Sequence, residues 1–193
     1  APKKKLPTPV DLQAYKEAQL KFEDEGLKGY LDEESLITVN KRDVLWVSGS
    51  GLLEIDSKNS YRVRLPHCDV VATKGDMIVI VTKEKTTIHA LNGRVTIEER
   101  SSKFKQALKA GESFWMGGLS PDGEHSRSGI YGADLDSVLE KVSKLKGFQI
   151  VELKAFRDDY QPRWPDTVER MAARDQKRVD ADRQAIEEHQ KKV

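Results

Sequence analysis

From Ser35 onward the chain alternates apolar and polar residues with a period of two, which is typical of strands with one buried face. Nine short apolar segments, rich in β-branched and aromatic residues, begin at residues 35, 44, 52, 61, 69, 77, 87, 94 and 113. Turn-forming residues separate them, and Asn92-Gly93, between two apolar runs, predicts a hairpin. This spacing predicts a mainly β domain of short strands, built as a sandwich, a barrel or a β-solenoid.

The residues before these strands predict a helix. Residues 1–7 are a basic, proline-containing leader, and Thr8 followed by Pro9 is the pattern of a helix start. Apolar residues then recur at helical spacing, and Gly26 is a suitable end. They are Leu12, Tyr15, Ala18 and Phe22. We therefore expect residues 1–34 to hold a leader and one short amphipathic helix.

Two further elements are predicted after the strands. Residues 134–146 have apolar residues at helical spacing between a capping Asp134 and a terminating Gly147, so they predict a helix. The segment "FQIVEL" at 148–153 predicts one more strand. We assign residues 35–157 to a β-domain that includes this helix.

Residues 158–193 are more polar than the domain before them. Two prolines in "DDYQPRWPD" interrupt regular structure, and a helix-forming stretch follows from Asp166 to the end. Its apolar positions form a stripe too narrow for a core helix. We expect a Pro/Trp linker followed by a polar C-terminal helical arm.

The bulk composition limits the classes of function. Hydrophobic residues make up 37% and charged residues 34% of the 193 residues, so we expect part of the chain to lie outside any core. With 33 basic and 32 acidic residues the net charge is +1, which provides no long-range attraction for nucleic acid. The longest apolar run, "MIVIV", has five residues, too few to span a membrane.

The start of the chain bears on its compartment. It begins at Ala1 without a methionine, as a chain does after removal of a signal peptide. The lone Cys68 excludes an internal disulfide and carries no information about compartment. We expect an exported protein that is periplasmic or otherwise extracytoplasmic.

The triplet His67-Cys68-Asp69 holds the residue types of a cysteine hydrolase. Neighbouring side chains on a strand point to opposite faces, so His67 and Cys68 would not touch. A Cys–His nucleophile also needs a third, orienting group, and the remaining histidines lie in no recognisable signature. We expect Cys68 to be a small buried residue and His67 to lie at a strand end, without a role in chemistry.

No other catalytic or metal-binding motif is present. The sequence lacks the H-x-H, H-E-x-x-H and C-x-x-C patterns, and "GSG" at 49–51 lacks the rest of a dinucleotide-binding loop. We therefore expect no enzymatic activity, no metal ion, no cofactor and no small-molecule ligand.

A series of strand and turn motifs runs through residues 44–116. The motifs are Leu65-Pro66, Val71-Ala72-Thr73, the run from Met77 to Val81, "LNGRVTI" at 91–97 and "LKAGE" at 108–112. This series resembles the FecR-type periplasmic domain. The resemblance implies an extracytoplasmic β-domain that works by protein contact and has no catalytic residues. Family members that relay iron-citrate signals also have a membrane helix and a cytoplasmic segment that handles a sigma factor, and we expect neither here.

Together these features favour a non-enzymatic, exported interaction or structural module of a bacterial envelope assembly, for example a secretion, motility or flagellar structure. Its expected partners are other envelope proteins. One alternative is a carbohydrate- or cell-wall-binding module using Trp46 and Trp115, although isolated strand tryptophans usually belong to a core. Another is an envelope signalling component related to FecR regulators. A third, a cupin-like enzyme, would need clustered histidines.

The C-terminal segment supplies the candidate partner residues. Tyr160 and Trp164 are of the types that dominate interface hot spots. Behind them a thin apolar seam, suited to lying on a partner, is formed by Val168, Met171, Val179 and Ile186. Two interpretations of Trp164 stay open: contact with a partner, and packing against its own β-domain.

Overall fold

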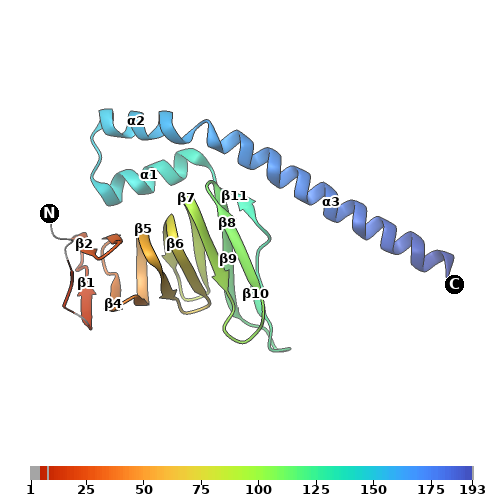
Figure 1. Cartoon of the computed structure of the whole chain (residues 1–193), viewed down its shortest axis with the longest axis horizontal. Coiled ribbons are helices and arrows are strands. Elements are labelled where there is room, and N and C mark those ends of the chain that lie inside the picture. Colours follow the sequence, from red (N-terminus) through yellow and green to blue (C-terminus); the bar gives the residue numbers. More distant parts are fainter. Residues whose placement is uncertain (1–4, 8, 193) are drawn as a thin grey trace.

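The computed structural model describes residues 5–7 and 9–192, which form one antiparallel sheet followed by three helices (Figure 1). The strands are β1 Val10–Gln13, β2 Leu20–Asp24, β3 Leu27–Leu31, β4 Leu36–Asn40, β5 Asp43–Arg64, β6 Asp69–Val81, β7 Lys85–Glu98, β8 Lys105–Lys109, β9 Glu112–Leu119, β10 His125–Arg127 and β11 Tyr131–Gly132. The helices are α1 Leu135–Lys146, α2 Ile150–Tyr160 and α3 Arg163–Lys191. The predicted mainly β fold with flanking helices and a C-terminal helix is confirmed.

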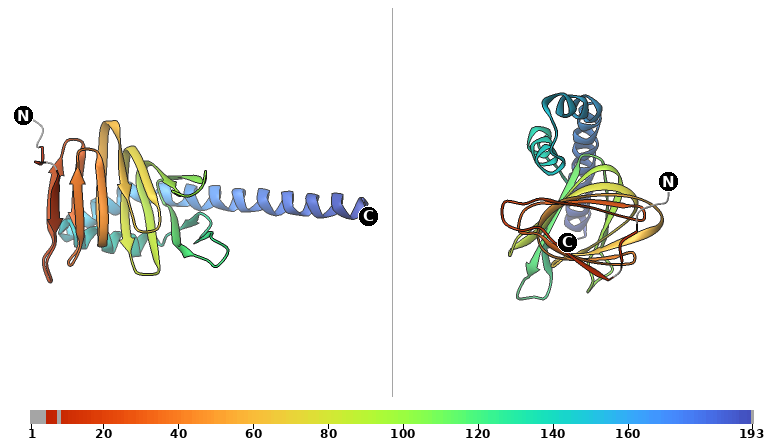
Figure 2. Two further views of the ribbon diagram at one scale, coloured as in Figure 1. Left: turned by 90° about the horizontal axis from the view of Figure 1, so that it is seen from below. Right: turned by 90° about the vertical axis from the view of Figure 1, so that its left-hand side faces the viewer.

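Long, bent strands fold the sheet into two layers. The first part of β5 pairs with β4, and residues 51–55 of the same strand pair with β3. The last part of β5 returns beside its start, where the Arg62 N–H donates to the Arg42 carbonyl at 2.9 Å. Three of the short segments expected from the sequence are therefore parts of one 22-residue strand. The right-hand view of Figure 2 shows the sheet curving into a flattened oval.

A pair of glycines accommodates one of the bends. Gly75 of β6 and Gly93 of β7 are register partners beside a shift in pairing. Gly93 has a φ of +65°, and a Cβ there would lie 2.4 Å from the Lys74 carbonyl oxygen. The hairpin predicted at Asn92-Gly93 is wrong, because β7 continues through both residues. The left-handed glycine bends a strand here and does not end it.

The main hydrophobic core lies between the two layers. Inward-facing side chains at alternate positions of the strands fill it, as expected for half-buried strands. Its largest fully buried members include Trp46, Tyr61, Leu27, Leu31, Ile37, Leu53, Ile55, Leu65, Met77 and Ile88. The Tyr61 hydroxyl donates to the Glu25 carbonyl oxygen, and burial is the main cause that raises the pKa of Tyr61 to about 12. This hydroxyl is therefore hydrogen-bonded where it reaches the border of the core.

The N-terminal helix predicted between residues 8 and 26 is wrong. Thr8 lies outside the described residues, but β1 pairs with β4 and β2 pairs with β3. The apolar residues of β2, Leu20 and Phe22, are also two apart, with the exposed Lys21 between them. Gly26, with a φ of +77°, closes the turn between β2 and β3. Tyr15, part of the expected apolar stripe, is exposed, so that stripe is no buried face.

α1 lies over the outer face of one layer, and α2 packs beside α1, farther from the sheet (Figure 1). α1 matches its prediction: the Asp134 side chain accepts the Ser137 N–H, and Gly147 is left-handed with a φ of +67°. A second apolar cluster joins the helices to the sheet. Its buried members are Leu52, Ile78, Leu91, Val138, Val142, Leu145, Tyr160 and Trp164.

The strand predicted at 148–153 is wrong, because α2 begins at Ile150. Ile150 and Val151 are 87% and 79% exposed, so this apolar run enters no sheet. Phe148, Phe156 and Tyr160 hold the segment on α1 and the sheet. Phe156 and Tyr160 are four residues apart within α2, a spacing that places them on one face of the helix.

α3 continues from α2 after a break at Gln161-Pro162 and runs far beyond the sheet (Figure 2, left). Pro165 lies in the first turn of α3, where no intrahelical N–H is required. The predicted helical arm is therefore present as secondary structure.

Candidate functional site

Aromatic rings hold the base of the α3 arm. The Phe156 and Tyr160 rings stack with centroids 4.2 Å apart, and Tyr160 meets Trp164 edge to face at 6.1 Å. The Trp164 Nε1–H donates to the Ala133 carbonyl oxygen at 2.9 Å. Tyr160 and Trp164 are buried against α1 and the sheet. Of the two interpretations of Trp164, the structure shows packing against its own domain.

Beyond Trp164 the apolar seam of α3 becomes exposed to solvent. Met171 is half-buried, whereas Val179 and Ile186 are 45% and 59% exposed. The side chain of Val168 lies outside the described part of the structure. Val179 and Ile186 are seven residues apart, so they lie within about 20° of each other on the helix surface. Their contact with a partner stays a prediction.

The His67-Cys68-Asp69 triplet lies at the turn between β5 and β6. Cys68 belongs to the main core, and burial raises the pKa of its thiol to about 12. His67 instead places Nδ1 2.9 Å from the Thr86 hydroxyl. The expected burial of Cys68 is confirmed, and the two side chains take different directions.

Asp69 belongs to a row of ion pairs across the sheet layer that does not carry the helices. Its buried carboxylate accepts from Arg62 at 3.1 Å, and Arg100 approaches its second oxygen at 3.2 Å without hydrogen-bond geometry. Arg62 also donates to Glu98 at 2.8 Å, which in turn pairs with Lys105 at 3.2 Å. These charges link β5, β6, β7 and β8, so the acidic member of the triplet stabilises the sheet.

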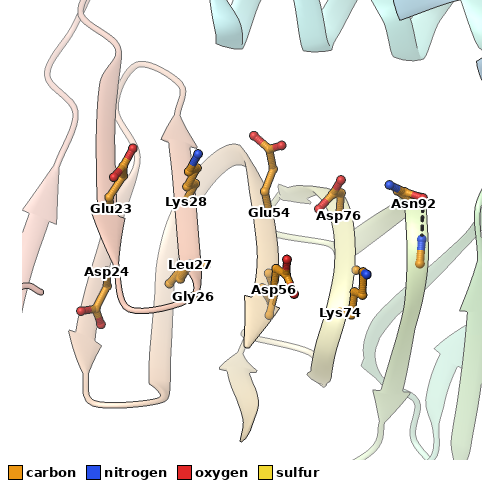
Figure 3. A pocket seen from close by; sticks show the side chains of 13 residues that line it. Glu23, Asp24, Gly26, Leu27, Lys28, Glu54, Asp56, Lys74, Asp76 and Asn92 are labelled. Carbon is orange, nitrogen blue, oxygen red and sulfur yellow. Dashed lines mark hydrogen bonds between the residues drawn. The ribbon is translucent and has the colours of Figure 1, made fainter. Parts of the chain in front are cut away.

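A polar hollow of about 500 Å³ crosses the layer that carries the helices. Five residues form a row along it, each the register partner of the next: Glu23, Lys28, Glu54, Asp76 and Asn92. Figure 3 shows their side chains on one face of adjacent strands. The sequence analysis missed this row, because each member is only an ordinary polar position until the strand registers are known.

The C-terminal end of α1 contributes a positive charge to this row. Glu54 and Asp76 are direct cross-strand partners of like charge. Lys146 compensates them, with Nζ 3.0 Å from Glu54 Oε1. Burial, and then Glu54, raise the pKa of Asp76 to about 6. The Lys146–Glu54 ion pair therefore joins the end of α1 to the row, while Lys28 and Lys74 are the cations that line the hollow.

Three other expectations concern ligands and membranes. Trp46 lies in the main core and Trp115 under Lys85, whose Nζ is 5.1 Å from the ring centroid, so the two tryptophans form no shared glycan platform. Within residues 5–7 and 9–192 no group of three or more His, Cys, Asp or Glu residues could hold a metal ion. None of the helices in that same part of the chain has the length and apolar character needed to cross a membrane.

We expect acid to loosen the contact between the helices and the sheet through His89. Its Nδ1 lies 2.7 Å from the Ser113 hydroxyl, and burial, then Lys141, lower the pKa of His89 to about 4. The folded state disfavours protonation of His89. The neutral ring therefore contributes its full stability above about pH 6.5, and this contribution is lost as the pH falls toward about 4.

Urea unfolding at pH 7.5 and pH 4.5 checks this expectation. The loss attributable to His89 should be about 2–3 kcal/mol at most. His89→Gln should flatten the pH dependence relative to the wild type. Asp76 acts in the opposite direction, because its raised pKa makes protonation below about pH 6 favour the folded state. An unchanged pH profile in His89→Gln would show that the ring does not carry the effect.

Comparisons with known proteins show a likeness of fold. A crystal structure described as a "putative anti-sigma factor" from Parabacteroides distasonis aligns with a TM-score of 0.55 and 15% identity, covering 67% of this chain and 62% of that one. A second structure of the same description and organism gives 0.53 and 12%, covering 72% and 76%. The chain thus spans less than two thirds of the first structure. No protein-family model and no curated protein matches the sequence.

Proposed function

We propose that this chain is a FecR-like protein-contact module of envelope signalling that works outside the cytoplasm and without catalysis. The observation that carries the proposal is the mainly β fold shared with two structures described as putative anti-sigma factors. The strand motifs at residues 44–116, which resemble the FecR-type domain, point in the same direction.

The proposal gives the body and the arm different roles. The two sheet layers and α1 form a packed body, and Tyr160 and Trp164 hold the base of α3 on it. The arm is the contact element, through the seam that contains Met171, Val179 and Ile186. An amphipathic helix commonly binds a partner protein through apolar residues at such spacing.

A structural role in an envelope assembly, for secretion or motility, is the second candidate. It is favoured by the 29-residue length of α3, much of which extends away from the body (Figure 2). Such an arm can connect components of a large complex.

Deleting the gene in its native bacterium and sequencing the RNA tests the two candidates. Envelope signalling predicts that transcripts change in the set of genes served by one alternative sigma factor. Wild-type protein should restore them, and the double variant Val179→Glu, Ile186→Glu should not. Ile150→Glu is the matched control, since Ile150 is an exposed apolar residue outside the arm.

Other outcomes separate the candidates. Unchanged transcripts together with lost secretion or motility would replace signalling with the assembly role. Unchanged transcripts with normal secretion and motility would contradict both.

A further inference from the structure

A second polar hollow, of about 430 Å³, lies where two hairpin turns meet the bulge of β5. The turns are β2–β3 at residues 25–26 and β4–β5 at residues 41–42. The bulge covers residues 57–60, where β5 shifts its register against β6. Four basic residues line the hollow: Lys5, Lys41, Arg42 and Lys58. They come from three separate segments that only the fold brings together, so the sequence analysis gave no sign of a ligand here.

The charges of these four side chains are available to a ligand. All four residues are exposed at the surface. None of them forms an ion pair with a carboxylate of the residues that the structure describes. Asp43, the acidic residue next to the β4–β5 turn, pairs instead with Arg64, with Oδ1 2.9 Å from Nε. The hollow therefore has a cationic rim that the protein itself does not neutralise by direct ion pairs.

The β4–β5 turn carries two cations where the backbone favours other residues. Lys41 and Arg42 form the two-residue loop between the register partners Asn40 and Asp43. Lys41 has a φ of +56°, a left-handed conformation that is strained for a lysine. Two-residue turns of this kind prefer Asn or Gly at such positions. Turn geometry therefore does not account for Lys41, and its side chain is the feature that a ligand site would use.

Backbone hydrogen bonds fix the walls of the hollow. The Asp56 N–H donates to the Gly26 carbonyl oxygen at 2.9 Å, which ties the β2–β3 turn to β5. The Arg62 N–H donates to the Arg42 carbonyl oxygen at 2.9 Å, which ties the β4–β5 turn to the end of the same strand. The backbone on both sides of the hollow is thus held in place before a ligand arrives, and less conformational entropy is lost on binding.

Two carboxylates in the lining limit the charge that the hollow can accept. Asp24 is only 8% exposed, and its Oδ1 accepts the Leu6 N–H at 3.1 Å. Glu25 is exposed on the β2–β3 turn. Set against the four cations, they leave a surplus of two positive charges. One phosphate monoester group, with a charge of about −1.5 to −2 at pH 7, balances this surplus, whereas a carboxylate balances half of it.

We propose that this hollow binds a phosphate group through Lys5, Lys41, Arg42 and Lys58. The planar Arg42 guanidinium can donate two parallel hydrogen bonds to phosphate oxygens, and the lysine ammonium groups add point charges. A soluble phosphate compound and a lipid headgroup both present this chemistry. The site does not depend on the proposed contact role of α3, so the RNA experiment above and the tests below stand or fall separately.

Titration of the full chain with inorganic phosphate at constant ionic strength, followed by amide NMR signals, is the first test. The signals of residues 41–42 and 57–59 should shift together and saturate. Acetate should bind at least about tenfold more weakly, because it brings half the charge. Shifts spread over the whole surface, no saturation up to about 100 mM phosphate, or equal binding of acetate would overturn the proposal.

Variants of the turn separate binding from folding. In the double variant Lys41→Asn, Arg42→Gln the asparagine suits the left-handed position, so stability to urea should be kept while the Kd for phosphate rises about tenfold or more. Lys58→Gln, on the bulge of β5, should also raise the Kd. The matched control Lys83→Gln, Lys109→Gln removes the same charge outside the hollow and should change the Kd less than about twofold. Retained affinity in the double variant, or an equal loss in the control, would contradict the proposal.

Vesicles distinguish the two sources of the phosphate group. Phosphatidic acid exposes a phosphate monoester, and phosphatidylcholine vesicles without it are the control. Co-sedimentation with phosphatidic acid that the Lys41→Asn, Arg42→Gln variant loses would assign the site to a lipid headgroup. Binding of inorganic phosphate without vesicle association would assign it to a soluble phosphate compound. Binding of neither inorganic phosphate nor phosphatidic acid would overturn the site.

Discussion

Gly93→Ala should lower the free energy of unfolding by about 2–4 kcal/mol, because an alanine is strained at positive φ and its Cβ meets backbone atoms. The φ of Gly93 is +65°, and the added Cβ would lie 2.4 Å from the Lys74 carbonyl oxygen and 2.9 Å from Gly75 Cα. Neither neighbour is the end of a flexible side chain, so the bend of β6 and β7 must shift. Urea unfolding followed by circular dichroism measures the loss.

Gly118→Ala is the matched control. Gly118 also lies in a strand, but a Cβ there would have no atom within 4 Å. Replacing a strand glycine with alanine reduces the entropy lost on folding, so the change should be neutral or stabilising by up to about 1 kcal/mol. Equal losses in both variants would show that the bend at Gly93 has no special steric demand.

Trp164→Ala should cost about 3–5 kcal/mol, the usual range for truncating a buried tryptophan. The substitution removes the edge-to-face contact with Tyr160 and the hydrogen bond to the Ala133 carbonyl oxygen. The loss should fall first on the attachment of α2 and α3, because the main core between the sheet layers lies elsewhere. Hydrogen exchange should become faster in α2 and α1 before it does in β5 and β6.

Ile150→Ala is the control for Trp164→Ala. It distinguishes the effect of truncating a buried side chain from the effect of removing apolar surface alone. Ile150 is an apolar residue at the start of α2, as Trp164 is at the start of α3, but Ile150 is almost fully exposed. Its truncation should change stability by less than about 0.5 kcal/mol. If Trp164→Ala were equally mild, the tryptophan would not anchor the arm, and its role as a partner contact would return.

Local sequence patterns predicted several elements correctly where only one kind of secondary structure, helix or strand, fitted the spacing of the apolar residues. The alternation in segments such as Arg94–Glu98 could bury residues only from a strand, and these segments lie in strands. α1 was predictable because Asp134 and Gly147 mark both ends of a clear apolar stripe. Cys68 was placed correctly because a free cysteine among apolar residues is usually core.

The predictions failed where the local pattern fitted two structures. Leu12, Tyr15 and Phe22 fit a helical stripe, but β1 and β2 form because β4 and β3 provide hydrogen-bonding partners from further along the chain. The run "FQIVEL" contains strand-forming residues, but the four-residue spacing of Phe156 and Tyr160 fits the helix that packs on α1. Aromatic spacing was the available signal for α2.

The sequence by itself determined the class of the fold, the capped helix α1, the burial of Cys68 and the polar character of the arm, because each depends on residues near one another in the chain. Only the tertiary structure decided the register that aligns Glu23, Lys28, Glu54, Asp76 and Asn92, the bend at Gly93, and the burial of Trp164. Those features depend on which distant segments pair, and pairing is set by the summed burial and hydrogen bonding of the whole sheet. No single segment carries that information.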